Sequence, residues 1–359
     1  MTAGQFRHRL EALQATPAYG SYERVRDWVL DMQAAAEQQA ASLDTARPSE
    51  YWSEELAGFE YMLDASPLIV DKLKHHSYHL TGLRVYDYRS HKQRAEMQLR
   101  NKLEALRALT SSDLFVPEPR GLGSFGFEID GGLFTVDTLK YFEALIALEK
   151  GGVLTPLREA SERQVVWEIG GGWGGFAYQF KRVCPNVTYV IVDLPATFLF
   201  SATYLMGTFP EATVMMYGQD DFENGWLDAD FVFVPHTALH AVTPPRLDLV
   251  VNMVSFQEMT SGQAAAYVEH ADAQGAPFLY SLNRERSAYN PQMDNVHAII
   301  AEKFDTREID VLPVSYVHMM ESLKPKKIPK PGREKAAKPS GVRKANDYRH
   351  IIGERGTQT

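Results

Sequence analysis

The pattern of apolar and polar positions divides the chain into two parts of different character. Within residues 1–150, apolar side chains recur at helical spacing, as at Tyr22, Val25 and Val29, and this period indicates amphipathic helices. Over residues 151–323, short apolar runs alternate with amphipathic segments, the pattern of a parallel sheet covered by helices. We therefore predict a mainly helical N-terminal domain, followed by an α/β domain whose Rossmann-like sheet has helices on both faces.

Short apolar runs in the second part predict its strands. They are residues 165–169, 189–192, 231–234, 247–253 and 277–281, with residues 213–217 as an accessory strand. Before them, the Pro- and Gly-rich residues 116–133 predict a loop or a short hairpin. Thr135 or Asp137 is the expected cap of a helix that ends before Gly151. A domain boundary is therefore expected close to residue 150.

The C-terminal residues 324–359 differ in charge from the rest of the chain. They hold eleven basic and three acidic residues, which leaves 26 basic and 43 acidic residues before them. Residues 324–345 are rich in Lys, Pro and Ala and predict a disordered tail. Apolar character returns at residues 348–353, so this end could dock onto the body. We expect truncation after Leu323 to leave the fold intact.

A glycine-rich turn directly follows the first strand of the second part. Residues 165–175 run from an apolar strand into five glycines within six positions, and an amphipathic helix begins at Phe176. Glycine permits positive φ angles and lets a ligand approach the backbone closely. The free N–H groups at a helix start attract anionic groups. The turn therefore predicts a site for a nucleotide-like ligand.

Two acids near this turn narrow the choice of ligand. Gly170, Gly172 and Gly175 match the dinucleotide fingerprint G-x-G-x-x-G. Glu168, however, stands two residues before the first glycine, where dinucleotide enzymes usually carry an apolar residue. This spacing resembles the first motif of class I S-adenosylmethionine (SAM) methyltransferases. Asp193 ends the next strand, where either class of protein places a carboxylate on a ribose diol.

Polar side chains follow the other predicted strands, at the sheet edge where parallel strands place their ligands. Glu258 is the first candidate for a general base, and His236 is the second. Further candidates are Asp220 and Asn252 for the cofactor and Ser255, Gln257, Asn283 and Arg284 for the substrate. The alternative for each is a helix cap, a helix-terminal acid or an exposed loop side chain. Trp173, inside the glycine turn, is expected either beside a bound cation or packed beneath the loop.

Several segments together resemble the sugar O-methyltransferase family of class I methyltransferases. The matches are Glu-Ile-Gly-Gly-Gly-Trp-Gly-Gly at residues 168–175, Val-Asp-Leu-Pro at 192–195 and Leu-Val-Val-Asn through Ser-Phe-Gln-Glu-Met at 249–259, with weaker ones at 72–82 and 348–353. The resemblance implies SAM-dependent methyl transfer to a hydroxyl of a sugar or amino sugar. It implies that SAM is held by Glu168, Gly170, Gly172, Gly174 and Asp193. It also implies that the helical part covers the cleft and supplies contacts to the acceptor, and that it could form a homodimer interface as well.

Three alternatives stay open at this point. The same fold could methylate a nitrogen of an amino sugar or aminocyclitol, because an amine needs no strong base. An NAD(P)-dependent sugar-modifying enzyme on a related sheet is opposed by Glu168 and by the lack of a Tyr-x₃-Lys pair after the fourth predicted strand. A scaffold without catalysis is opposed by the intact glycine turn.

Composition sets the remaining limits. The 359 residues are 45% hydrophobic and 23% charged, as in ordinary globular proteins. Cys184 is the single cysteine, so no disulfide can form within the chain. The first residues lack the apolar core of a signal peptide, and no apolar run approaches the length of a membrane span. We therefore expect a cytoplasmic protein without a membrane partner. The acidic body argues against nucleic acid. Residues 74–79 hold three histidines but no cysteine, and we expect no metal there.

Overall fold

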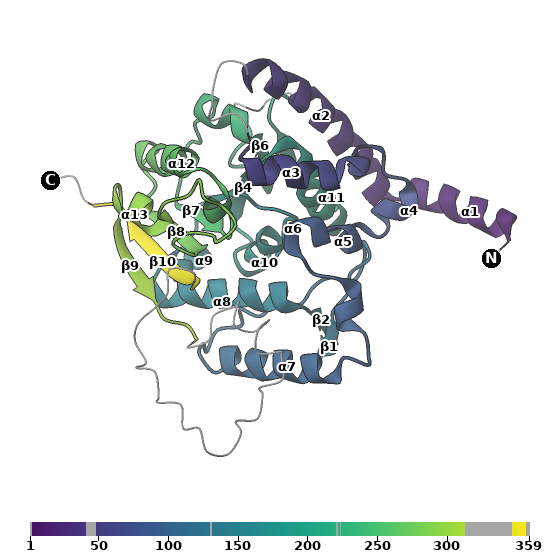
Figure 1. Cartoon of the computed structure of the whole chain (residues 1–359), viewed down its shortest axis with the longest axis horizontal. Helices are drawn as coiled ribbons and strands as arrows, with labels where there is room; N and C mark the ends of the chain where they lie inside the picture. The colour runs from purple at the N-terminus through teal and green to yellow at the C-terminus, as the bar shows by residue number, and fades with distance from the viewer. Residues whose placement is uncertain are drawn as a thin grey trace.

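The computed structural model describes residues 2–40, 48–129, 131–219, 222, 224–312 and 347–356. At its centre lies an eight-stranded sheet in the order β5-β6-β4-β3-β7-β8-β10-β9 (Figure 1). Neighbouring strands from β5 to β8 are parallel, whereas β10 is antiparallel to both β8 and β9. This is the mostly parallel α/β sheet that the alternating pattern predicts.

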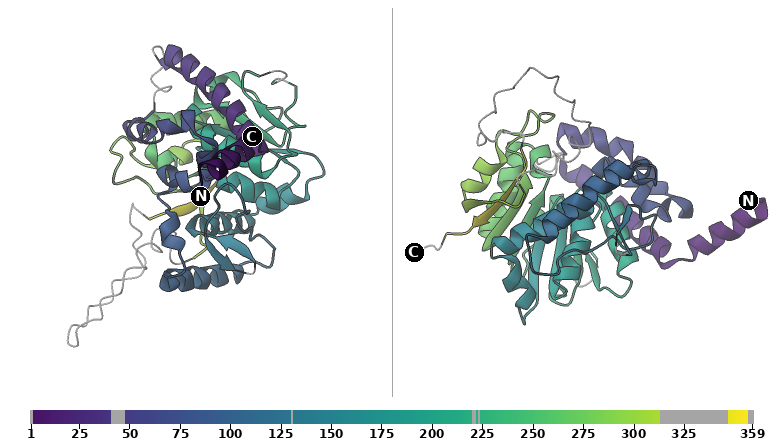
Figure 2. Two further views of the ribbon diagram at one scale, coloured as in Figure 1. Left: turned by 90° about the vertical axis from the view of Figure 1, so that its right-hand side faces the viewer. Right: turned by 90° about the horizontal axis from the view of Figure 1, so that it is seen from below.

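The elements before the sheet are mainly helical, as predicted. They are α1 (Ala3–Gln14), α2 (Pro17–Ala40), α3 (Glu50–Gly58), η2 (Glu60–Asp64), α4 (Pro67–Val70), α5 (Leu73–His76), α6 (Tyr78–Thr81), η3 (Val85–Tyr88), α7 (Gln93–Arg107), β1 (Phe127–Ile129), β2 (Gly132–Phe134), α8 (Val136–Lys150) and α9 (Leu154–Glu159). Strands β1 and β2 form the short hairpin expected within the Gly-rich segment. Thr135 caps α8, since its side chain accepts the Thr138 N–H in a capping box. Helix α1 buries no side chain and projects from the body (Figure 2).

The second part follows the predicted alternation of strands and helices. Its elements are β3 (Gln164–Ile169), α10 (Gly175–Val183), β4 (Val187–Asp193), η4 (Pro195–Thr197), α11 (Phe198–Thr208), β5 (Val214–Met216), β6 (Phe231–Pro235), η5 (His236–Ala241), β7 (Leu249–Met253), η6 (Phe256–Glu258), α12 (Ser261–Ala273), β8 (Phe278–Asn283), α13 (Val296–Ala301), β9 (Asp305–Ile309) and β10 (Arg349–Glu354). The accessory strand β5 forms one edge of the sheet.

Alternate residues of the strands build two separate hydrophobic cores. Val166 of β3 and Ile191 of β4 face a core that contains side chains of α2, α7, α8, α10 and α11. Val165 and Val190, on the opposite face, pack with α12 and α13. The sheet is therefore covered by helices on both faces, as predicted. Side chains of residues 1–150 pack in the same hydrophobic core as the strands. The domain boundary expected close to residue 150 therefore stays a prediction.

The C-terminal segment takes a place inside the sheet. All six residues of β10 pair with β8, and five of them also pair with β9. Ile351 and Ile352 are buried, and His350 lies between Tyr280 of β8 and Glu143 of α8. The apolar end does dock, but as an internal strand. This pairing argues against the expectation that truncation after Leu323 leaves the fold intact, because the truncation removes a strand from inside the sheet.

Candidate active site

The strand order reverses between β3 and β7, and a cavity of about 730 Å³ opens beyond the carboxyl ends of these strands. Such switch points are where open α/β sheets bind ligands. The cavity wall combines the glycine loop, the loops after β4, β6, β7 and β8, and residues of α3, α6 and α8. The helical part therefore supplies one side of the site and the sheet supplies the other.

Three glycines of the loop have positive φ angles, and each has a different environment. A Cβ atom on Gly170 would lie 2.1 Å from Oγ of Ser255, and one on Gly174 would lie 3.2 Å from the backbone of Ser201 in α11. A Cβ atom on Gly172, with φ of 56°, would meet nothing within 4 Å, and Gly172 lines the cavity whereas Gly174 does not. Gly172 is thus the position where a ligand can lie directly against the backbone.

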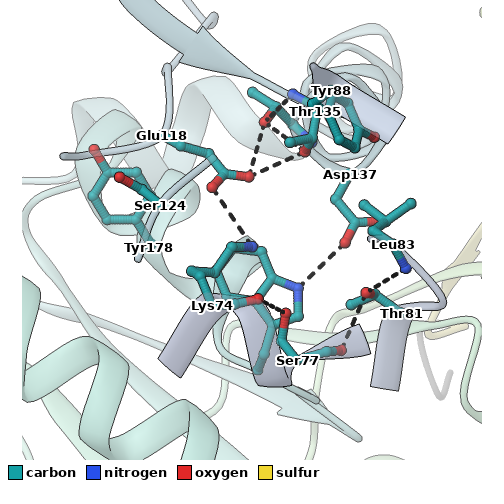
Figure 3. Close-up of polar contacts among 12 residues, drawn as sticks. Lys74, Ser77, Thr81, Leu83, Tyr88, Glu118, Ser124, Thr135, Asp137 and Tyr178 are labelled. Atoms are coloured by element: carbon teal, nitrogen blue, oxygen red, sulfur yellow. Dashed lines mark hydrogen bonds and ion pairs between the residues drawn. The ribbon is translucent and has the colours of Figure 1, made fainter. Parts of the chain in front are cut away.

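Trp173 packs beneath the loop while part of it lines the cavity. Nζ of Lys74 lies 3.0 Å from the centre of the indole ring, and Nε1 of the indole donates to Oδ2 of Asp137 at 3.3 Å. Figure 3 shows Lys74 extending toward Glu118, with Nζ 3.5 Å from Oε2, and Oε1 of Glu118 accepts from the hydroxyl of Thr135. Buried polar side chains of the helical part therefore hold the glycine loop in place through Trp173.

Two acids of the cavity flank this loop. Glu168 is 2% exposed and accepts from the Tyr189 hydroxyl at 3.1 Å. Burial raises the pKa of Glu168 to about 8, and burial raises that of Asp193 to about 6. Oδ2 of Asp193 accepts from the N–H of Gly172 at 3.0 Å, and Oδ1 accepts from the N–H of Leu194. Asp193 thus ties the end of β4 to the glycine loop.

The two candidate bases and two of the candidate substrate residues also line the cavity. They are Glu258, His236, Ser255 and Arg284. Burial raises the pKa of Glu258 to about 8, while the positive charge of Lys140 opposes the rise. The guanidinium of Arg284 stacks on the ring of Tyr348, 4.6 Å from its centre. The structure therefore brings these side chains and the glycine loop to one space.

Three other predicted residues lie behind the wall of the cavity. Asn252 donates to the carbonyl of Ile169 at 2.8 Å and accepts from Asn283 at 2.8 Å. The amide of Gln257 donates to the Tyr348 hydroxyl and accepts from the backbone N–H of Arg284. These side chains connect the loops after β3, β7 and β8 to one another. The remaining candidate, Asp220, lies outside the described residues.

Several cavity residues were missed by the sequence analysis. Lys140 and Tyr141 come from α8, and further wall residues come from distant segments: Tyr51, Trp52 and Glu55 of α3, and Tyr348. One signal was available, because the charged residues Asp137, Lys140 and Glu143 recur every third position among mainly apolar residues. Charged side chains at that spacing share a helix face.

Within the described residues, no group of three or more His, Cys, Asp or Glu side chains is arranged to hold a metal ion. No helix of the described part is long and apolar enough to cross a lipid bilayer.

No family model and no curated protein matches this sequence. Among solved structures, the comparison finds matches of low similarity to methyltransferases. Human N-acetylserotonin methyltransferase, solved with SAM, is 13% identical over 72% of this chain and 67% of its own, with a TM-score of 0.31. The pyocyanin biosynthetic protein PhzM is 13% identical over 59% of this chain and 57% of its own, with a TM-score of 0.33. An O-methyltransferase family protein from Burkholderia thailandensis is 15% identical over 62% and 60%, with a TM-score of 0.30.

The chain thus spans between 57% and 67% of the length of these three structures.

Proposed function

We propose that the protein is a SAM-dependent methyltransferase that acts on a hydroxyl group of a sugar or amino sugar. The observation that carries the proposal is Gly172, whose missing side chain leaves open space beside two acids, Glu168 and Asp193. SAM carries an adenosyl group with a ribose diol and a zwitterionic amino-acid end. The cavity has an acid, Asp193, for the ribose diol and the glycine loop for the amino-acid end. Its volume of about 730 Å³ is within the range of small-molecule sites.

The fit of SAM follows from the positions of the loop and the acids. Asp193 lines the cavity at the end of β4 and would accept from the ribose hydroxyls. Glu168 lines the same space at the end of β3. Gly170 and Gly172 would hold the amino-acid end, as the motif resemblance implies.

When bound, SAM supplies an electrophilic methyl group on a sulfonium. The residues of this chain contribute positioning and proton transfer. Holding the acceptor oxygen close to the methyl makes the step effectively unimolecular. Glu258 lines the cavity and, once deprotonated, can take the proton of the acceptor hydroxyl. His236, at the start of η5, is the second group that could do so.

The proposed sugar acceptor is supported by the lining of the cavity on the side of the helical part. Tyr51, Trp52 and Tyr78 of this part contribute aromatic side chains, and Glu55 contributes a carboxyl group. Arg284, in the loop after β8 on the other side, adds a guanidinium. Sugar rings expose apolar C–H faces, which can pack on aromatic rings, and polar hydroxyl edges, which can bond to charged groups. This lining provides side chains of both kinds. This wall also suits an amino sugar, so transfer to nitrogen is the second candidate.

Isothermal titration calorimetry with SAM, S-adenosylhomocysteine, NADH and NADPH tests the class of ligand. We expect micromolar binding of the two adenosyl ligands and none of the nicotinamide cofactors. Binding of NADH or NADPH alone would overturn the proposal and would support a dehydrogenase or dehydratase.

Replacing Asp193 by alanine is expected to weaken SAM binding by about 1.5–3 kcal/mol, the usual contribution of hydrogen bonds to a charged group. The titration should be done well above pH 6, where this carboxyl group, whose pKa is about 6, is ionised. Asp193→Asn is the matched control, since it keeps one oxygen to accept from the backbone of the loop. An alanine variant with unchanged affinity would show that Asp193 serves the loop and not the ligand.

Replacing Glu258 by glutamine is expected to slow methyl transfer by roughly 10²–10⁴, the usual contribution of a general base. The base acts when deprotonated, so wild-type activity should rise with pH and level off above about 8, where the pKa of Glu258 lies. The variant should lose this rise while keeping its affinity for SAM.

The same pair of measurements separates oxygen from nitrogen acceptors. Transfer that survives in Glu258→Gln, with its pH dependence intact, would favour an amine acceptor that loses its own proton.

A further inference from the structure

Three charged side chains lie buried along α8, and one of them reaches the cavity. Asp137 is fully buried, Lys140 is 8% exposed and Glu143 is 2% exposed. Of the three, Lys140 alone lines the cavity. Its Nζ lies 2.9 Å from Oδ1 of Asp137. Burying an ammonium group costs free energy. A buried lysine beside a ligand cavity is therefore a candidate for binding a charged group of the ligand.

Lys140 is connected to the glycine loop through Asp137. Oδ1 of Asp137 faces Lys140, while Oδ2 accepts from the indole N–H of Trp173, which lies in the loop itself. Lys74, whose partner is Glu118, lies over the ring face of the same indole. The four charged groups form two ion pairs around Trp173. The network therefore holds the ammonium of Lys140 at a fixed place relative to the loop.

Lys140 also lies near the acids on either side of the site. Burial raises the pKa of Glu168 and of Glu258, and in both cases the positive charge of Lys140 opposes the rise. Two other cationic side chains line the cavity. Arg84 is exposed, and Arg284 stacks on Tyr348. Lys140 is tied to the glycine loop, because its partner Asp137 also accepts from the indole of Trp173.

We propose that Lys140 binds the carboxylate of the amino-acid end of SAM. This inference rests on the proposed function. A carboxylate entering the cavity beside Asp193, which is ionised at neutral pH, needs a cation to offset that negative charge. An ammonium has three donors, so Lys140 can keep Asp137 and still donate to the ligand. Asp137 and Lys74 are positioning residues in this assignment.

The test compares two ligands that differ only in the carboxylate. Calorimetry measures Kd for S-adenosylhomocysteine and for its decarboxylated analogue, which keeps the amine and the nucleoside. We expect wild-type protein to prefer the carboxylate-bearing ligand by about 10- to 100-fold, the size of a charge-assisted hydrogen bond. In Lys140→Met, which keeps the length of the chain without its charge, this preference should fall to within about threefold of unity. Lys140→Arg should keep most of it.

A second variant guards against a folding defect. Lys140→Met leaves Asp137 buried without its cation, so the double variant Asp137→Asn/Lys140→Met removes both charges and keeps an oxygen for Trp173. It should also show no preference between the two ligands. A wild-type preference retained in Lys140→Met or in the double variant would overturn the inference while the proposed function stands. Failure of wild-type protein to bind either ligand would instead overturn the proposed function.

Discussion

Replacing Gly172 by valine is expected to weaken SAM binding by at least about a thousandfold, or roughly 4 kcal/mol, while the protein stays folded. The reason is that Gly172 is the one loop glycine of the three with positive φ whose added Cβ would meet no protein atom. A branched side chain there would extend into the cavity and fill the path of the ligand. Calorimetry with SAM and with S-adenosylhomocysteine measures the loss, and thermal unfolding measures the fold.

Backbone strain is the competing explanation, and the chain offers a matched control for it. Gly152, at the end of α8, has φ of 73° and no atom within 4 Å of an added Cβ, and it does not line the cavity. Valine at either position pays a similar penalty for the left-handed conformation, of order 1–2 kcal/mol. Gly152→Val should therefore lower stability about as much as Gly172→Val and leave SAM affinity unchanged. Equal effects of both variants on affinity would show that strain, not occlusion, is responsible.

The glycine loop could be predicted from sequence because its signals are local. An apolar run, Glu168 and the spaced glycines specify strand, turn and helix within residues 165–183. The parallel register of β3 with β4 and β7 then brings Glu168, Asp193 and the loop after β7 to one edge. The strand ends therefore predict which loops surround the cavity.

The direction of each side chain in those loops could not be predicted in the same way. Asn252 and Asn283 follow the same strand-end pattern as Glu258, yet they bond to each other within the sheet. Gln257 is adjacent to Glu258, but its amide lies between Arg284 and Tyr348. Since Tyr348 belongs to a segment some ninety positions further along the chain, no local signal specifies this contact. Long-range pairing decided which polar side chains face the ligand.

Removal of the C-terminal segment by truncation after Asn346 is expected to abolish cooperative folding. The truncation deletes β10, which separates β8 from β9 in the sheet. It exposes the surfaces covered by Ile351 and Ile352, each worth about 1.5–3 kcal/mol when buried. It also removes His350, which bonds to Tyr280 and faces Glu143. Together these losses reach the 5–15 kcal/mol that typically stabilises a domain.

Truncation after Gly356 is the matched control, because it shortens the chain but keeps all of β10. It should unfold with the wild-type midpoint in guanidinium chloride. Ile352→Ala tests the same contact in the full chain and should lower the free energy of unfolding by about 2–5 kcal/mol, as for other fully buried aliphatic side chains. If truncation after Asn346 preserves a cooperative transition at the wild-type midpoint, β10 is dispensable. The sheet would then close without it, and the position of Tyr348 in the cavity wall would need another support.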